Sequence, residues 1–289
     1  MDNNTNSHGF SRHIPNPIKL QIRQECGFGC VVCGMTIYTY EHIDPEFADA
    51  AEHDPTKMAL LCGGCHLKVT KRIWSKDKIK KARLAPKCKQ QGYSNDFFDI
   101  GEPFGISVGR IYFYKTETGD LLQIDGKTVL SMRKVDGEPP LLSGIFHDHN
   151  GNILFEIKDN EWFGKPEAWD IESVGNTLTI KDKQGSILLQ INARPPHIVA
   201  IEIANLRYGD NALISNEATG QITIQTKIGK QIDAKTGNII TGGPVVIQNG
   251  KIQFHNGANV MLGQDGVVMN PLNFDSFILT GQIASRSTN

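Results

Sequence analysis

Hydrophobic and polar positions follow two different patterns along the chain, and the pattern changes near residue 105. Before residue 105, segments that suit helices flank two short apolar runs. After it, short runs rich in Ile, Val and Leu are separated by turns that contain glycine, for example TETGD, DHNGN and DKQGS. Short runs of this kind at fairly even spacing are typical of an all-β domain. The sequence therefore predicts an α+β protein whose helices lie in the first third.

The first predicted element is a short helix over residues 15–26, PNPIKLQIRQEC. Ile18 and Ile22 lie four residues apart and share one face, and Pro17 suits the first turn of a helix. Residues 1–13 before it are polar, and we expect them to be disordered or loosely attached.

The next predicted elements are strand, loop, strand and helix. Residues 39–43 form the first strand, which ends near Pro45, and residues 58–61 form its partner. A helix then opens at His66, and a second helix, for which Ser75 is a candidate cap, continues towards residue 86.

The β region contains a loose repeat. Gly119, Gly151, Gly185 and Gly220 are separated by 32, 34 and 35 residues. This spacing fits a barrel of meandering strands, a sandwich or an irregular β-solenoid, and it does not choose among them.

Composition and charge indicate where a partner would bind. Hydrophobic residues make up 39% of the 289 residues and charged residues 21%, which suits a folded core. Residues 1–95 hold 14 Lys and Arg against 9 Asp and Glu, whereas residues 96–289 hold 16 against 22. A polyanionic partner is therefore expected on the first third. The ten basic residues from Lys68 to Lys89 form either a solvated helix face or a phosphate-contacting surface.

The chain has no feature of a membrane or secreted protein. It lacks a run of about 18 apolar residues, and its N-terminus lacks the apolar region of a signal peptide. We therefore expect a cytoplasmic protein without a membrane span.

The six cysteines all lie before residue 90, and four of them form two CxxC pairs. Cys30 and Cys33 are separated by 28 residues from Cys62 and Cys65. Two CxxC loops at such a distance are typical of a tetrahedral zinc site. Four protein ligands leave no open position, so this Zn²⁺ is expected to be structural. A redox CxxC would need a βαβ setting, which is absent from the predicted elements.

Further metal-binding residue types lie between or directly after the cysteine pairs: Glu41, His42, His53 and His66. Together with the cysteines, the segments CGFGCVVCG, YEHIDP and HDPTKMALLCGGCHLKVT resemble the HNH (ββα-metal, His-Me finger) endonucleases that carry a four-cysteine zinc. The resemblance covers residues from about 12 to 83.

The resemblance implies a catalytic role for several residues. His42 matches the general base that deprotonates the attacking water. Glu41 and His66 match the ligands of a catalytic Mg²⁺ or Mn²⁺. The family's usual Asn is replaced by Lys57, which suits phosphate binding, so His53 or Thr56 is expected to take the role of that Asn.

The resulting prediction is a zinc-stabilised HNH nuclease domain over residues 1–90, a linker over 91–104 and an all-β domain over 105–280. The expected substrate is DNA, with RNA possible, and the expected nucleic-acid contacts are Lys57, Lys68, Lys71 and Arg72. The β domain is expected to form homo-oligomers or to bind a regulatory protein. Analogy suggests antiphage defence or restriction. The alternatives are an RNase and a zinc-stabilised nucleic-acid- or protein-binding module without catalysis.

Overall fold

The computed structural model describes residues 5–101, 104–115, 118–226, 229–234, 236–241, 245–248, 251–255, 259–263, 267–269 and 276–279. The chain forms two compact units. The first contains residues 1–96 and 163–186, and the second contains residues 97–162 and 187–289. Residues 102–103 of the predicted linker and residue 280, the predicted end of the β domain, lie outside the described residues.

The first unit holds all the helices found in the described residues. Its helices and strands are α1 (Asn16–Cys26), β1 (Thr39–His42), η1 (Phe47–Asp49), η2 (Pro55–Lys57), β2 (Met58–Leu61), α2 (Gly63–Thr70), α3 (Lys76–Leu84), α4 (Lys87–Gln91), β11 (Asp170–Val174) and β12 (Thr177–Lys181). The predicted order of strand, loop, strand and helix is confirmed. β1 and β2 pair antiparallel, with Thr39 opposite Leu61 and His42 opposite Met58.

Local sequence signals explain where the helices begin and end. α1 has Pro17 in its first turn, and Gly27 ends it in the left-handed conformation, at φ 73°. The Ser75 hydroxyl accepts a hydrogen bond from the Lys78 N–H at 3.3 Å and caps α3 as predicted. α2 begins at Gly63, three residues before His66, because the Cys62 side chain acts as its cap.

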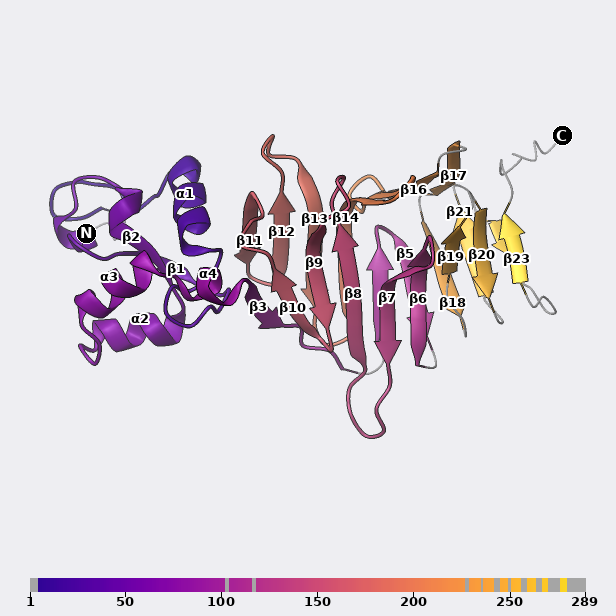
Figure 1. Ribbon diagram of the computed structural model, residues 1–289, viewed down its shortest axis with the longest axis horizontal. Coiled ribbons are helices and arrows are strands. Elements are labelled where there is room, and N and C mark those ends of the chain that lie inside the picture. Colours follow the sequence, from indigo (N-terminus) through magenta and orange to yellow (C-terminus); the bar gives the residue numbers. More distant parts are fainter. Residues whose placement is uncertain are drawn as a thin grey trace. The chain divides into compact units, whose positions relative to one another are not determined.

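The core of the first unit is built around β2, which is buried along its whole length. Ile22 of α1, Leu60 of β2 and Ile79 of α3 are each fully buried in one hydrophobic cluster. Figure 1 shows the β1–β2 hairpin with α1, α2 and α3 around it. The hairpin therefore has little freedom to move, and the side chains at the end of β1 are held in place.

The N-terminal residues differ from the prediction. Residues 5–13 were expected to be loosely attached, but Thr5 pairs with Ser11 and the Asn6 side chain bonds to the loop that contains η1. Polar residues alone did not indicate this contact, because it depends on backbone carbonyls that lie about forty residues further along the chain.

The hairpin β11–β12, residues 170–181, belongs to the first unit although it lies far along the chain. Its anchor is a buried ion pair: Arg23 of α1 donates from Nε and Nη2 to the two carboxylate oxygens of Asp170, both at 2.7 Å. Arg23 also donates to the Tyr40 hydroxyl at 2.8 Å. Bidentate pairing of this kind is a strong and directional contact, and it joins the hairpin to the strand that carries the candidate site.

The second unit is formed of strands. They are β4 (Gly105–Val108), β5 (Ile111–Lys115), β6 (Gly119–Ile124), β7 (Lys127–Arg133), β8 (Leu141–His147), β9 (Ile153–Lys158), β13 (Ile187–Arg194), β14 (Ile198–Tyr208), β15 (Asn211–Asn216), β16 (Gln221–Thr226), β17 (Gly229–Ala234), β18 (Thr236–Thr241), β19 (Val245–Gln248), β20 (Lys251–His255), β21 (Asn259–Gly263), β22 (Val267–Met269) and β23 (Ser276–Leu279). Two further strands, β3 (Ser94–Phe97) and β10 (Glu161–Gly164), contain the positions at which the chain passes between the units.

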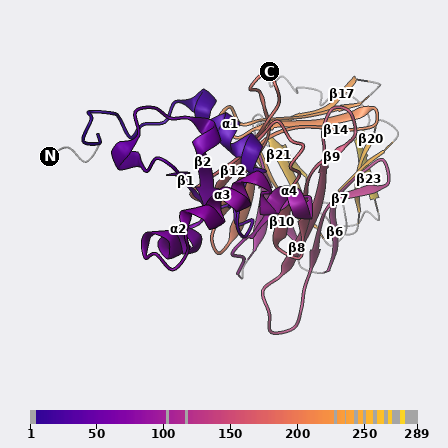
Figure 2. The ribbon, with the colours of Figure 1, turned by 60° about the vertical axis from the view of Figure 1, so that its left-hand side comes forward.

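The strands of the second unit form two open sheets, so the barrel, one of the three predicted alternatives, is wrong. One sheet contains the order β23-β20-β19-β6-β7-β8-β9, and the other contains β13-β14-β4-β5-β18-β21-β22. The sheets lie as separate layers (Figures 1 and 2), and the Tyr208 hydroxyl of one donates to the Ile145 carbonyl of the other at 3.0 Å. Consecutive strands such as β5 and β6 lie in different sheets, and among the described strands no pairing joins the two ends of either order.

Three of the predicted glycine turns lie in the described residues, around Gly151, Gly185 and Gly220. Gly151, Gly185 and Gly220 all have positive φ, between 73° and 82°, which favours glycine. Asp148 and Asp182, three residues before two of these glycines, each accept two backbone N–H groups of their own turn. Across the described residues, no helix is both long and apolar enough to cross a bilayer.

Candidate functional site

Four cysteine thiols converge at one side of the first unit. The sulfur atoms of Cys30, Cys33, Cys62 and Cys65 all lie within 4.8 Å of one another. Cys33 Sγ lies 3.5 Å from Cys62 Sγ and 3.8 Å from Cys65 Sγ. A tetrahedral zinc with Zn–S bonds of about 2.3 Å separates its sulfur ligands by about 3.8 Å. The cluster therefore fits a metal ion such as zinc, as the sequence predicts.

The first pair of cysteines lies in a tight loop after α1. The Cys30 N–H donates to the Met35 carbonyl and the Gly34 N–H donates to the Cys30 carbonyl, both at 2.8 Å. A Cβ at Gly29 would lie 2.5 Å from the Gly34 carbonyl oxygen, so only glycine fits there. The loop is therefore closed enough to aim both thiols at one point.

The second pair lies where β2 joins α2. Cys62 caps the helix, and its Sγ accepts the Cys65 N–H at 3.4 Å. Because Cys65 lies in the first turn, both thiols face the loop that holds Cys30 and Cys33. His66 is the next residue of the same turn, so the cysteine cluster also determines where His66 lies.

The thiols differ in their tendency to ionise. A hydrogen bond from Cys33 lowers the pKa of Cys30 to about 5, whereas burial raises the pKa of Cys65 to about 12. The two remaining cysteines, Cys26 and Cys88, are outside the cluster and fully buried, and burial raises their pKa values to about 11 and about 12. The Cys88 thiol donates to the Gly34 carbonyl at 3.4 Å, which supports the first loop.

Glu41 and His66 form a pair close to the cysteine cluster. Glu41 is the third residue of β1, and its Oε2 lies 3.0 Å from Nε2 of His66. The other carboxylate oxygen, Oε1, lies 3.0 Å from Nζ of Lys76, which begins α3. Lys76 also donates to the His42 carbonyl at 3.3 Å, so it connects the helix to both residues of the strand.

His42, the last residue of β1, belongs to a chain of hydrogen bonds. Its Nε2 lies 3.1 Å from Nδ1 of His53, and Nε2 of His53 lies 3.0 Å from the His13 carbonyl oxygen. A carbonyl only accepts, so His53 Nε2 carries the hydrogen, and in neutral His53 Nδ1 is the acceptor. His42 Nε2 then donates, which leaves the lone pair on Nδ1 of His42.

The environment also keeps His42 unprotonated. Burial lowers the pKa of His42, and the nearby His53, Arg12 and Lys76 lower it further, although Glu41 acts in the opposite direction. The imidazole is therefore neutral at pH 7 and available as a proton acceptor.

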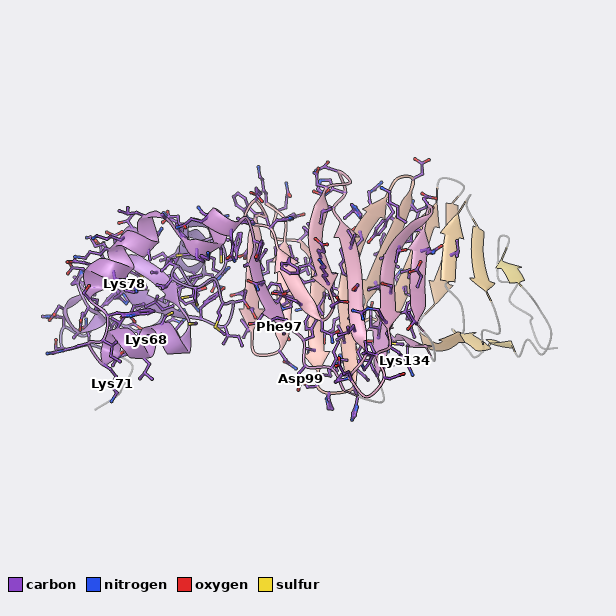
Figure 3. All side chains as sticks on the ribbon, turned by 60° about the horizontal axis from the view of Figure 1, so that its bottom comes forward. Lys68, Lys71, Lys78, Phe97, Asp99 and Lys134 are labelled. Atoms are coloured by element: carbon purple, nitrogen blue, oxygen red, sulfur yellow. The ribbon has the colours of Figure 1, made fainter. Side chains whose placement is uncertain are left out.

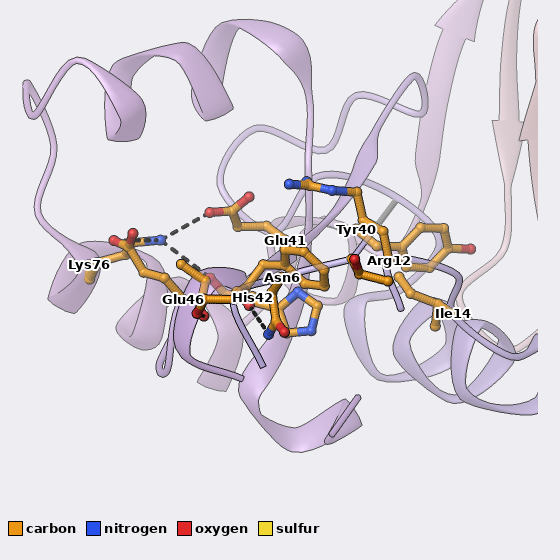
Figure 4. A pocket seen from close by; sticks show the side chains of 12 residues that line it. Asn6, Arg12, Ile14, Tyr40, Glu41, His42, Glu46 and Lys76 are labelled. Carbon is orange, nitrogen blue, oxygen red and sulfur yellow. Dashed lines mark hydrogen bonds and ion pairs between the residues drawn. The ribbon is translucent and has the colours of Figure 1, made fainter. Parts of the chain in front are cut away.

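A cavity of about 370 Å³ opens beside these residues (Figure 4). Its lining includes Thr5, Asn6, Ser7, Arg12, Ile14, Tyr40, Glu41, His42, Glu46, Phe47, Ala48 and Lys76. Neighbouring residues of a strand point to opposite faces, and Glu41 and His42 both reach this cavity because β1 ends at His42. Among the described residues, only the four cysteines form a group of three or more candidate metal ligands.

The predicted nucleic-acid contacts lie outside this cavity. Lys57 forms an ion pair with Asp54 at 3.0 Å and lines a smaller cavity of about 180 Å³, to which His42 also contributes. Lys68 and Lys71 lie at the solvent-exposed end of α2 and Arg72 directly after them, as Figure 3 shows for the two lysines.

Trp74 holds part of the basic surface together. Nζ of Lys68 and Nζ of Lys78 lie 4.6 Å and 3.9 Å from the centre of its ring. Lys78, which belongs to the basic run from Lys68 to Lys89, therefore lies beside Lys68 on this surface.

Sequence reasoning did not single out two cavity residues, Arg12 and Lys76. Lys76 was one member of a long basic run and had no signal of its own. Arg12 lies in the segment that was expected to be loosely attached, and its position follows only from the contacts of that segment.

Comparison of the chain with protein-family models, with curated proteins and with solved structures finds no match. The function is therefore inferred from the cysteine cluster and the cavity alone.

Proposed function

We propose that the protein is a metal-dependent endonuclease of the HNH type that hydrolyses phosphodiester bonds in DNA. The observation that carries this proposal is the pair of Glu41 and His66, 3.0 Å apart, together with the cavity that Glu41 and His42 line. A carboxylate, an imidazole ligand and a neutral imidazole base are the groups that metal-assisted hydrolysis of a phosphodiester requires.

The side chains of Glu41 and His66 would hold a divalent ion such as Mg²⁺ or Mn²⁺. Such ions keep several waters and use one or two protein ligands together with substrate oxygens, so two ligands are a sufficient protein contribution. When bound, the ion supplies polarisation of the scissile phosphate and stabilisation of the leaving oxygen.

His42 is the proposed general base. Its Nδ1 carries the lone pair and accepts a proton from the attacking water, while its Nε2 stays bonded to His53. His53 acts as a positioning residue, because its bond to the His13 carbonyl determines which of its ring nitrogens accepts from His42.

The four-cysteine zinc is proposed to act as a scaffold. It joins the loop after α1 to the first turn of α2, and His66 is part of that turn. Lys57, Lys68, Lys71 and Arg72 are proposed to contact the phosphates of the nucleic acid on either side of the cut, in agreement with the basic charge of residues 1–95.

The proposal is tested by incubating plasmid DNA and a structured RNA with the full chain and a series of divalent ions. Wild type is expected to nick the plasmid with Mg²⁺ or Mn²⁺, and His42→Ala to lose roughly 10²–10⁴-fold of the rate. His149→Ala, a histidine of the second unit, is the matched control. Absence of cutting with every ion, or equal cutting by His42→Ala, would reject catalysis. Faster digestion of the RNA than of the plasmid would make RNA the proposed substrate and leave the proposed roles of the residues unchanged.

The alternative from another class is a zinc-stabilised nucleic-acid- or protein-binding module without catalysis. One observation favours it: the Lys76 ammonium lies 3.0 Å from Glu41 and neutralises the carboxylate that would hold the ion. This alternative predicts DNA binding without cutting in the same assay.

The role of the second unit stays a prediction. Homo-oligomerisation or binding of a regulatory protein is expected, and a role in antiphage defence or restriction rests on analogy. Light scattering of the full chain would test self-association directly, with a monomer as the result that contradicts it.

A further inference from the structure

The segment before α1 is attached to the rest of the first unit by side-chain hydrogen bonds. Asn6 acts as its anchor, since Nδ2 donates to the carbonyls of Phe47 at 2.8 Å and Ala50 at 2.7 Å. Oδ1 of the same side chain accepts the N–H groups of His8 and Phe10, both at 3.0 Å. All the usual donor and acceptor positions of one amide are therefore used to attach residues 5–14, here called the N-terminal arm.

The arm also contacts His53, the proposed positioning residue. The Phe10 ring lies 4.5 Å from the ring of His53, and the His13 carbonyl accepts from His53. Ile14, at the end of the arm, is buried in the core of the unit. The arm is thus fixed at both ends, with Arg12 between them.

Arg12 is held over the cavity by an aromatic ring. Its guanidinium carbon lies 4.3 Å from the centre of the Phe47 ring, and the Phe47 ring lies 5.5 Å from the ring of His42. Figure 4 shows Arg12 among the side chains that line the cavity with Glu41 and His42. A cation–π contact orients the guanidinium and leaves its N–H groups free to donate.

The two cations of the cavity differ in their partners. Lys76 is engaged by Glu41 at 3.0 Å and by Glu46 at 3.6 Å. Arg12 forms no ion pair with a carboxylate in the described part of the chain, and it is close enough to His42 to lower the pKa of His42. A guanidinium without an acidic partner, aimed into a cavity, suits a bidentate contact with a phosphate.

We propose that Arg12 binds a backbone phosphate of the nucleic acid in this cavity, and that the N-terminal arm forms one wall of the substrate site. This inference rests on the proposed function, because it takes a phosphodiester as the ligand of the cavity. It adds a specific substrate contact in a segment outside the zinc-bound hairpin and helix.

The test measures binding separately from cutting. All variants are made in full-length His42→Ala protein, and a fluorescein-labelled DNA duplex is titrated at several salt concentrations. Arg12→Gln is expected to weaken binding by about tenfold and to lower the slope of log K against log salt by about 1, the effect of one lost phosphate contact. Arg133→Gln, the same change in the second unit, is expected to leave both unchanged.

Two further variants separate a lost contact from a misfolded arm. Arg12→Lys keeps the charge and loses the planar fork, so an intermediate affinity is expected. Asn6→Ala releases the arm without changing the charge and is expected to weaken binding in the same direction as Arg12→Gln. Zinc content and the thermal midpoint of each variant show that the first unit is intact.

Equal affinity and equal salt slope for Arg12→Gln and Arg133→Gln would overturn the inference, as would a duplex that does not bind at all. The proposed function is tested separately, by the cutting assay. If wild type binds DNA through Arg12 but cuts with no divalent ion, the endonuclease proposal fails and the Arg12 contact stands. If wild type cuts and Arg12→Gln binds DNA as Arg133→Gln does, the endonuclease proposal stands and the Arg12 contact fails.

Discussion

The cysteine cluster and the cavity that Glu41 and His42 line both belong to the first unit, yet they depend on the rest of the fold to different degrees. The cluster takes its four ligands from two short loops, each with a CxxC spacing that aims two thiols at one point. The cavity collects Arg12, His42 and Lys76 from an arm, a strand and a helix. Local spacing aims each pair of thiols, so the first site needs only two loops to meet, whereas the second exists only after three segments have packed.

The two sites also differ in how their polar groups are satisfied. Among the cysteines, the close contacts of the cluster are between thiols, so a metal ion replaces weak interactions. In the cavity, Glu41 already contacts Lys76 and His66. A metal must therefore compete with an ion pair there.

The largest effect is expected from removal of a zinc ligand. Cys62→Ser should unfold the first unit, because structural zinc binding contributes on the order of 10–16 kcal/mol and a lobe of this size buries little core. Metal analysis should find one zinc in wild type and none in the variant, and circular dichroism should show loss of helix. Cys88→Ala, outside the cluster, should keep its zinc. A helical, zinc-free Cys62→Ser protein would contradict the scaffold role.

A smaller loss of stability is expected from the ion pair that anchors the β11–β12 hairpin. Asp170→Ala removes the bidentate partner of the buried Arg23 and leaves it only the ion pair with Glu172 at 3.1 Å, so the free energy of unfolding should fall by about 3 kcal/mol. Asp159→Ala, which breaks the exposed pair with Arg133, should cost no more than about 1 kcal/mol. Urea unfolding of both variants checks this, and equal losses would show that burial does not strengthen the Arg23 contact.

The next prediction concerns the rate of DNA cutting and not the stability of the fold. His53→Gln should lower the rate of DNA cutting by about tenfold or more, a part of the roughly 10²–10⁴-fold that a general base contributes. DNA affinity should not change, because His53 is expected to act on His42 and not on the substrate. Single-turnover rates and duplex titrations measure the two quantities. A change confined to affinity would mean that His53 does not orient the base.

The smallest effect is expected at Lys76. Lys76→Met removes the cation that competes for Glu41, so Mn²⁺ should bind more tightly, by about fivefold for an ion pair worth about 1 kcal/mol. Lys80→Met, which breaks the exposed pair with Asp44, is the control. Calorimetric titration gives both affinities, and an unchanged or weaker value for Lys76→Met would argue that Glu41 is not a metal ligand.

Much of the first unit could be predicted because its signals are local. The strand at residues 58–61 is a run of apolar residues, Ser75 is a helix cap, and the glycine after α1 ends that helix. The position of the hairpin at residues 170–181 could not be predicted. Asp170 and Arg23 lie 147 residues apart, and nothing in either segment alone indicates that their charges pair.

The β strands were likewise visible as short runs, but the runs did not choose among a barrel, a sandwich and a solenoid, and the structure excludes the barrel. A run of apolar residues shows that a strand is buried and not which strand lies beside it. The parallel pairing of β14 with β4 and of β18 with β5 joins strands far apart in sequence, and it leaves both sheets open.

The cysteine cluster could be predicted from the residues alone, because each CxxC loop restricts its two thiols through bonds only a few residues long. The spacing also indicated Glu41, His42 and His66 as residues of one region. The contacts of Glu41 with His66 and Lys76, of His53 with His42, and the position of Arg12 at the cavity are visible only in the folded chain. These contacts depend on the packing of distant segments, and the spacing of residues along a chain carries no direct record of that packing.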